Sequence, residues 1–300
     1  MAQPQRPYGN NIWLNELSEL VGGASGGFLF GIPLIYTLEV WWIGSQVSPP
    51  ILLCILTLTL GVVFSLNCVE GFRASRPSRA IDIIQESVEA LAIGLTCATL
   101  MLILLSRITS QTPLTESLGK IVFESVPFSL GVALSKLILS GEPGWEKAQK
   151  RSPSKDDGSN RSAASSQTPA GTLADLSTTL FGAVIIAFSI APTDEVPVLA
   201  AASSPPKLLA IVAASLIVSY GIVFVAGFTN QSKRQQQQGI FQSPQNETLV
   251  SYILSLLASA LMLWFFQQLS WDDPWYLWLC YTIVLGLPAT IGGAAGRLAV

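Results

Sequence analysis

The sequence predicts an all-α, polytopic membrane protein of about eight transmembrane helices, arranged as a parallel 4+4 internal repeat. Half of the 300 residues are hydrophobic and 12% are charged, against roughly a quarter charged in an average soluble domain. Lipid rather than water must therefore face much of the chain. Long apolar runs recur along the chain, and the pattern of the first half returns in the second.

The apolar runs are each long enough, at about 20 residues, to cross a hydrocarbon core. They lack the polar alternation of a membrane β-barrel, so we expect helices. Pro-Pro pairs at the start of two runs suit the first turn of a helix, where a missing N–H costs nothing. The predicted helices span residues 17–43, 50–71, 84–106, 118–140, 173–192, 207–228, 248–269 and 275–298.

Basic residues gather in the loops of one side, and the positive-inside rule assigns that side to the cytoplasm. It includes both termini, which we therefore expect to be cytoplasmic, and no cleavable signal peptide is evident. Tryptophans near the opposite boundary predict an interfacial aromatic belt. The basic residues of the first side are Arg6, Arg73, Arg76, Arg79, Lys136, Lys147, Lys150, Arg151, Lys155, Arg161, Lys233, Arg234 and Arg297. The opposite side has Arg107, Lys120 and Lys207, and its tryptophans are Trp41, Trp42, Trp271, Trp275 and Trp278.

The chain divides into a cytoplasmic N-terminal tail at 1–13, a first four-helix repeat at 14–140, a linker at 141–171 and a second four-helix repeat at 172–300. The linker is polar, rich in Ser and Pro, and of mixed charge, so it buries too little apolar surface to fold by itself. We expect a disordered cytoplasmic linker that acts either as a plain tether or as a docking segment for a protein partner.

Matching residues follow the same order in the two halves. The segment LNELS at 14–18 faces LADLS at 173–177, and Pro49-Pro50 faces Pro205-Pro206. Each unit has an even number of helices, so the copies share one orientation about an axis along the membrane normal.

The repeat also matches prolines that we expect inside helices. Pro33 pairs with Pro192, and Pro127 pairs with Pro288. Each proline removes one backbone hydrogen bond and can free a carbonyl, which a membrane tolerates only where protein or water satisfies it again. These helix-break positions either contribute polar groups to a site or only bend their helices.

Acids near the outer ends of the first and fifth helices are candidate functional groups. Both copies place an acid, with a Thr beside it, just beyond a proline. Carboxylates, hydroxyls and freed carbonyls suit protons, Na⁺ or Ca²⁺ rather than soft metals. Alternatively, these acids only solvate a helix end. The predicted oxygen-rich cluster comprises Tyr36, Thr37, Glu39, Thr193, Asp194 and Glu195.

Glu124 is the other candidate, about two turns into the fourth helix from the outer side. It precedes Pro127 by three residues, and its repeat partner is Leu285. An ionisable group within the span needs a partner or a purpose because its charge is costly there. Glu124 either binds a proton or cation, or pairs with Lys120 four residues earlier.

Several classes of chemistry lack their usual residues. The chain has no histidine, which is the commonest general base and transition-metal ligand. The cysteines lie inside apolar runs without CxxC spacing, and they are typical of small buried hydrophobes rather than disulfides. No hydrolase motif is present. We therefore expect no enzyme, cofactor or metal centre and no nucleic-acid partner. The cysteines are Cys54, Cys68, Cys97 and Cys280.

Two segments carry a resemblance to a known family: FLFGIPLIYTLEVWWIG at 28–44 and FSIAPTDEV at 188–196. They resemble a family of bacterial integral membrane proteins, frequent in photosynthetic bacteria and known only as a domain of unknown function. The resemblance covers nearly the whole chain outside the linker. It implies a multi-helix membrane fold in a bacterial inner membrane, with a thylakoid membrane as an alternative, and it brings no established activity.

Two functions fit these observations. The first is a transporter or channel for a small cation or proton, using the acids near the outer ends of the first and fifth helices. The second is a non-transporting membrane scaffold, assembly factor or sensor whose cytoplasmic linker recruits a protein partner. A membrane enzyme is a weaker third hypothesis, because no catalytic constellation is apparent.

Overall fold

The structure is a computed structural model that describes residues 10–70, 80–139, 169–225 and 244–298. All regular structure in these ranges is helical. Seven of the described helices are long and apolar enough to cross a membrane, or eight if a bent pair counts as one span. The predicted all-α, polytopic membrane fold is thus confirmed. The N-terminal tail up to residue 9 and most of the predicted linker lie outside the described residues.

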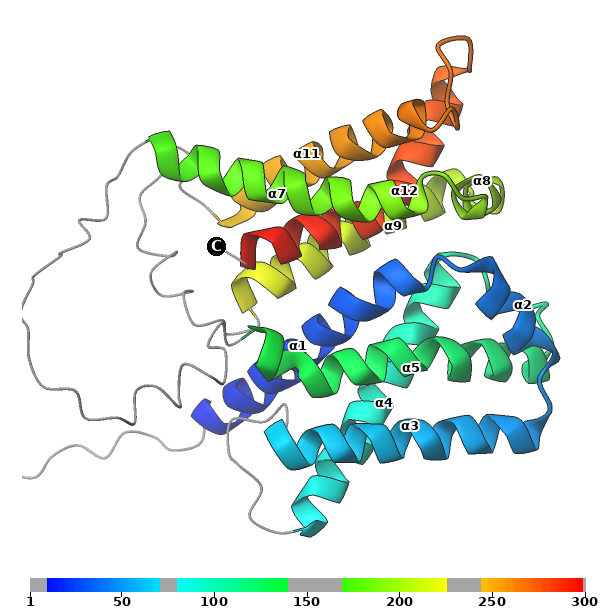
Figure 1. Cartoon of the computed structure of the whole chain (residues 1–300), viewed down its shortest axis with the longest axis vertical. Helices are drawn as coiled ribbons and strands as arrows, with labels where there is room; N and C mark the ends of the chain where they lie inside the picture. The colour runs from blue at the N-terminus through cyan, green and yellow to red at the C-terminus, as the bar shows by residue number, and fades with distance from the viewer. Residues whose placement is uncertain (1–9, 71–79, 140–168, 226–243, 299–300) are drawn as a thin grey trace, which may run out of the picture.

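The helices form two groups that lie side by side (Figure 1). The first group consists of α1 (Asn10–Leu34), α2 (Leu38–Gln46), α3 (Pro49–Glu70), α4 (Ala80–Leu104) and α5 (Leu114–Leu139). The second consists of α7 (Pro169–Ile190), α8 (Glu195–Ala201), α9 (Pro205–Tyr220), the π-helix η1 (Gly221–Val225), α11 (Pro244–Phe265) and α12 (Trp275–Leu298). The short helices α2 and α8 lie at one end of the bundle, here called the α2/α8 end.

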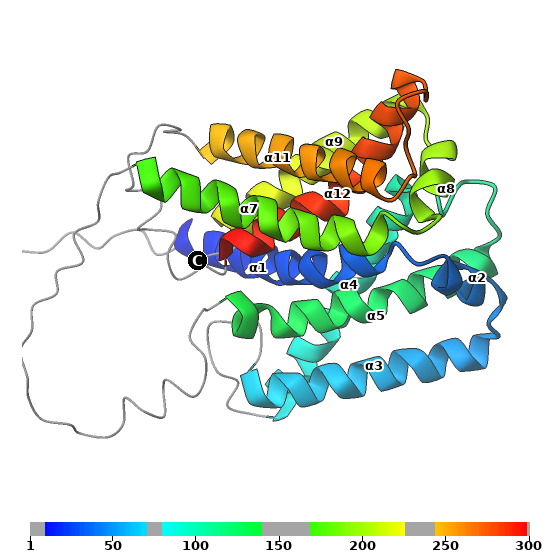
Figure 2. The same ribbon diagram turned by 45° about the horizontal axis from the view of Figure 1, so that its top comes forward.

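One long helix is central to each group. In the first group α5 packs against α1, α2, α3 and α4, and in the second α12 packs against α7, α8, α9 and α11. The groups meet where α1 contacts α12 and η1, and both views place α1 at this seam and α3 at the periphery (Figures 1 and 2). The same helix pairs therefore contact in each half, as the predicted repeat requires, while the repeat itself stays a prediction.

Close glycine contacts correct the register of that repeat. Gly26 of α1 packs on the backbone of Gly131 in α5, and Gly182 of α7 packs in the same way on Gly292 in α12. Aligning these contacts places Gly26 opposite Gly182, so Pro33 corresponds to Ser189 and not to Pro192. In this alignment of contacts the two prolines stand three residues apart, whereas the match by residue type paired them directly.

The first predicted helix, 17–43, is two helices in the structure. The chain ends α1 at Leu34 and starts α2 at Leu38, with Thr37 in an extended conformation between them. The second group repeats this break, since α7 and α8 are bent by 88°. Thr37 donates its hydroxyl to the carbonyl of Leu34 at 2.8 Å, which satisfies a carbonyl that the ending helix leaves without a partner.

The four prolines take different positions relative to these helices. Pro127 and Pro288 lie inside α5 and α12, as expected. Pro33 also lies inside α1, next to its last residue. Pro192 lies in the turn between α7 and α8, so it follows a helix end rather than kinking a helix interior.

Candidate functional site

The structure places the residues of the predicted cluster of outer acids and hydroxyls in different surroundings. Glu39 and Asp194 are exposed, whereas Glu195 is buried with 6% of its surface accessible. The hydroxyl of Thr193, like that of Thr37, donates a hydrogen bond to the last carbonyl of the preceding helix, here that of Ile190 at 2.7 Å. Among the described residues, no group of three or more His, Cys, Asp or Glu side chains could hold a metal ion.

Tyr36 binds a carbonyl that a proline has freed. Its buried hydroxyl donates to the carbonyl of Val284 in α12 at 2.6 Å. In an ordinary helix the N–H of residue 288 would bond this carbonyl, but Pro288 has no N–H. Tyr36 replaces the missing donor from the other group, so this proline and this tyrosine act together at the seam.

Glu195 also crosses the seam, from the first turn of α8 to the start of α2. Its Oε1 accepts a hydrogen bond from the backbone N–H of Leu38 at 3.2 Å. An acid suits this position because the first N–H groups of a helix lack partners and carry partial positive charge. Its buried Oε2 has no hydrogen-bond partner in the described structure.

Glu124 is the most buried acid of the described spans. Only 1% of its surface is accessible, and its buried Oε1 has no hydrogen-bond partner. The indole N–H of Trp41 in α2 faces this carboxyl but does not reach ordinary hydrogen-bonding geometry, since Trp41 Nε1 also lacks a partner. The Trp41 N–H donor and the Glu124 Oε1 acceptor therefore lie near each other at the contact between α2 and α5, and neither forms a hydrogen bond.

Arg107 covers the face of the same indole. Its guanidinium carbon lies 4.2 Å from the centre of the Trp41 ring, within the range of a cation–π contact. Burial lowers the pKa of this guanidinium and the charge of Glu116 opposes that shift, so Arg107 stays charged at neutral pH, as arginine does in proteins. The described structure shows no ion pair between Arg107 and Glu124, which contact different sides of one ring.

Lys120 and Glu116 link this buried group to the surface. The ammonium of Lys120 pairs with the carboxylate of Glu116 and donates to the carbonyl of Arg107 at 3.3 Å. The expected alternative, an ion pair of Lys120 with Glu124, does not form. Glu116, Lys120 and Glu124 follow at intervals of four residues, so they lie on one face of α5, which runs from the α2/α8 end into the span.

Glycines bring α2 against this face. A Cβ on Gly44 would lie 3.2 Å from the carbonyl oxygen of Gly119, so only small residues allow the two backbones to meet. The contact buries Trp41, with 1% of its surface accessible. We expected Trp41 in the interfacial belt together with Trp42. That prediction is wrong for Trp41, while Trp42 is exposed.

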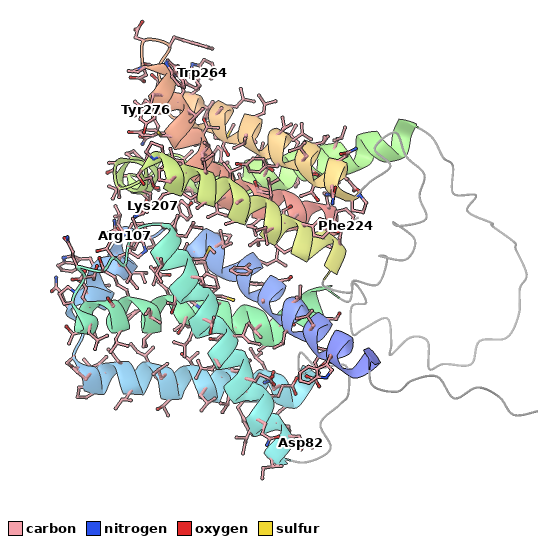
Figure 3. The ribbon with its side chains drawn as sticks, turned by 180° about the vertical axis from the view of Figure 1, so that it is seen from behind. Asp82, Arg107, Lys207, Phe224, Trp264 and Tyr276 are labelled. Atoms are coloured by element: carbon pink, nitrogen blue, oxygen red, sulfur yellow. The ribbon has the colours of Figure 1, made fainter. Side chains whose placement is uncertain are left out.

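The polar group is confined to the first half of the chain. In the predicted repeat, aligned on the glycine contacts of α1 with α5 and of α7 with α12, the second half has apolar or uncharged residues at the matching positions. Trp41, Arg107, Glu116, Lys120 and Glu124 correspond to Pro197, Gln268, Leu277, Tyr281 and Leu285. Polar side chains of the second half instead contact the first half. Besides Glu195, Lys207 donates a hydrogen bond to the hydroxyl of Ser106 at 2.5 Å. Figure 3 shows Arg107 and Lys207 close together there.

A second buried charge lies at the opposite end of the bundle. Arg297 of α12, with 1% of its surface accessible, pairs with Glu247 and donates to the hydroxyl of Ser251 at 3.1 Å. Its guanidinium also lies 5.7 Å from the ring of Phe224 in η1, and Figure 3 places Phe224 at the end away from Arg107. We expected Arg297 only as one of the basic residues of the cytoplasmic side. Its burial depends on packing that periodicity does not reveal.

Apolar helices long enough to span a bilayer, with a few buried charges packed between them, define a polytopic integral membrane protein. Comparison with protein families matches residues 19–300 to the family described as "Putative integral membrane protein (DUF2391)". The chain belongs to this family. No curated protein and no solved structure gives a significant match.

Proposed function

We propose that the protein is a transporter or channel for a proton or small cation, and that Glu124 is its central acid. One observation carries the proposal: Glu124 is buried in a membrane-spanning helix with a carboxylate oxygen that has no partner. A bare carboxylate is costly in such a place, so a bound proton or cation must neutralise it for part of the time. Ionisable residues inside membrane spans commonly mark the pathways of ions and protons.

Polar side chains extend from Glu124 in both directions. Toward the α2/α8 end, Lys120 and Glu116 reach the surface on the same face of α5. Toward the opposite end, the buried hydroxyls of Ser129 and Ser135 follow on α5. Ser129 Oγ has no hydrogen-bond partner, so it is free to receive or donate one. These groups support the proposal that a small charged species moves along α5.

Glu195 has a supporting part in this proposal. It is the other buried acid of the α2/α8 end with an oxygen that lacks a partner, and it holds the start of α2, the helix that carries Trp41. The exposed Glu39 and Asp194 would act only by attracting cations to the surface near these acids.

Flux through liposomes that contain the purified protein tests the proposal. We expect flux of one or more of H⁺, Na⁺, K⁺ and Ca²⁺, measured with ion-sensitive dyes, and loss of that flux in E124Q. E195Q should lower the flux, and E39Q combined with D194N should lower it less. D272N is a matched control, because Asp272 is an exposed acid in the connection between α11 and α12.

Two outcomes would refute the proposal. One is flux in E124Q equal to that of D272N, which would exclude Glu124 from the pathway. The other is the absence of flux for every ion tested, Cl⁻ included, which would favour the scaffold, assembly-factor or sensor function. Deletion of residues 142–170 should then remove a partner from pull-downs.

We further propose that both termini face the cytoplasm of a bacterium, across its inner membrane or a thylakoid membrane. The start of α1 and the end of α12 lie at the same end of the bundle (Figure 1), and the basic loops support a cytoplasmic position for that end. Reporter fusions at the two termini should both be active only in the cytoplasm. Activity of either fusion outside the cytoplasm would contradict this orientation.

A further inference from the structure

We propose that the species bound at Glu124 is a proton and not a metal cation. The inference deepens the proposed function and rests on it only for the movement of the proton across the membrane. The binding of a proton at this carboxyl can be measured separately.

The described contacts of Glu124 include no cluster of side-chain ligands for a metal ion. Ca²⁺ takes six to eight oxygen ligands, and a dehydrated monovalent cation also needs several. Trp41, the side chain that faces Glu124, has only an N–H donor and no acceptor. The described residues hold no group of three acids, histidines or cysteines that could bind a metal.

A proton on Glu124 needs only one acceptor nearby, and α5 provides one. Pro127 has no N–H to bond the carbonyl of Phe123. This carbonyl belongs to the residue before Glu124 and lacks its usual helical donor, so we take it as the acceptor for a proton on Glu124. A protonated carboxyl is neutral, and burial among apolar helices then costs far less than for a carboxylate.

The charges around Glu124 also disfavour a metal cation. Arg107 covers the ring that faces Glu124, and Lys120 lies one helical turn away on α5. Among the described residues, Glu116 pairs with Lys120 and its charge also acts on Arg107. An added metal ion would be repelled by both cations at short range. A bound proton instead forms a covalent O–H bond, and the carboxyl becomes neutral.

The same charges allow the proton to leave. Arg107, Lys120 and Glu116 together carry one positive charge, and ionised Glu124 would bring the group to neutrality. The unused N–H of Trp41 is a ready donor for the carboxylate. Neighbouring groups therefore stabilise both the protonated and the ionised form of Glu124, as a site that binds and releases a proton requires.

Glu39 of α2 is exposed, and the remaining charged groups on the helices packed against α5 lie in the half of each helix away from α2. The acids of α1 and α4 lie within the first ten residues of these helices, at the end away from α2, and the only charged residue of α3 is its last. They are Glu16, Glu19, Asp82, Glu86, Glu89 and Glu70.

Labelling of the full-length protein with dicyclohexylcarbodiimide tests the proposal without any transport measurement. This apolar reagent adds to protonated carboxyls, and peptide mass spectrometry locates the adduct. We expect an adduct on Glu124, none at that position in E124Q, and none on the exposed Asp272. E124D, which keeps a carboxyl, should still be labelled if E124Q does not fold.

Competition by metal ions decides between a proton and a cation. A metal ion that bound Glu124 would, at ten times its Kd, slow the labelling about tenfold by mass action. We expect no slowing by Na⁺, K⁺ or Ca²⁺. Protection by any of these ions, or the absence of an adduct on Glu124 in folded protein, would overturn the proposal. Labelling without protection in a protein that passes no ion would uphold the proton site and refute the transport function.

Discussion

The bond between Tyr36 and Val284 predicts a measurable coupling between a tyrosine and a proline of different helices. The substitution Y36F removes the hydroxyl that donates to the buried Val284 carbonyl at 2.6 Å. Hydrogen bonds between membrane helices contribute about 0.6 kcal/mol on average and about 1.7 kcal/mol at most. The short distance and the burial of Tyr36 place the expected loss in the upper part of that range.

The background P288A changes this expectation. Alanine at 288 restores the N–H that an ordinary helix would direct to the Val284 carbonyl. Since the carbonyl then has a partner within its own helix, removal of the Tyr36 hydroxyl should cost less. The double-mutant cycle should therefore give a coupling energy of about 1 kcal/mol, much of the cost of Y36F itself.

Equilibrium unfolding by sodium dodecyl sulfate in mixed micelles, followed by tryptophan fluorescence, measures these four free energies. Y276F is the control, because Tyr276 is exposed and its hydroxyl bonds no carbonyl among the described residues. An equal cost of Y36F in the presence and absence of Pro288 would refute the claim that the tyrosine replaces a donor that the proline removes.

Two further predictions concern packing and buried charge. G131A should destabilise the protein by about 1 to 3 kcal/mol, since its Cβ would lie 2.9 Å from the carbonyl carbon of Gly26, whereas G61A, with open space around it, should be neutral or slightly stabilising. Equal stabilities in the same unfolding assay would exclude the close α1–α5 contact. E247L should destabilise the protein by about 3 to 5 kcal/mol. R297L should cost less, because Arg297 is fully buried whereas Glu247 is one-third exposed. The reverse order of folded yields would contradict this reasoning.

The transmembrane helices were predictable because an apolar run of sufficient length carries its own signal. The last predicted helix, 275–298, agrees with α12 at both ends. The break at 35–37 was not predictable in the same way. A proline near a helix end is typical both of a kinked helix and of a helix that stops. Here the Thr37 hydroxyl bonds the carbonyl of Leu34, which favours the stop.

The candidate site was predicted in part. Glu124 stood out because an acid within a span is costly, but its surroundings depend on contacts between helices. Adjacent tryptophans point about 100° apart on a helix, and only the close approach of Gly44 to Gly119 determines that Trp41 is the buried one. Lys120 likewise has an acid four residues away on each side, Glu116 and Glu124. In the structure it pairs with Glu116, which lies nearer the surface, where charges lose less hydration.

The depth of Glu124 makes its charge state sensitive to voltage. Ten residues separate it from the start of α5, which is about 15 Å of helix, or about half the hydrocarbon thickness. A unit charge gains or loses about 2.3 kcal/mol across a full potential of 100 mV. A proton that reaches Glu124 from the α2/α8 end would thus experience about half of that energy, and an energised membrane would change the occupancy of this carboxyl about sevenfold.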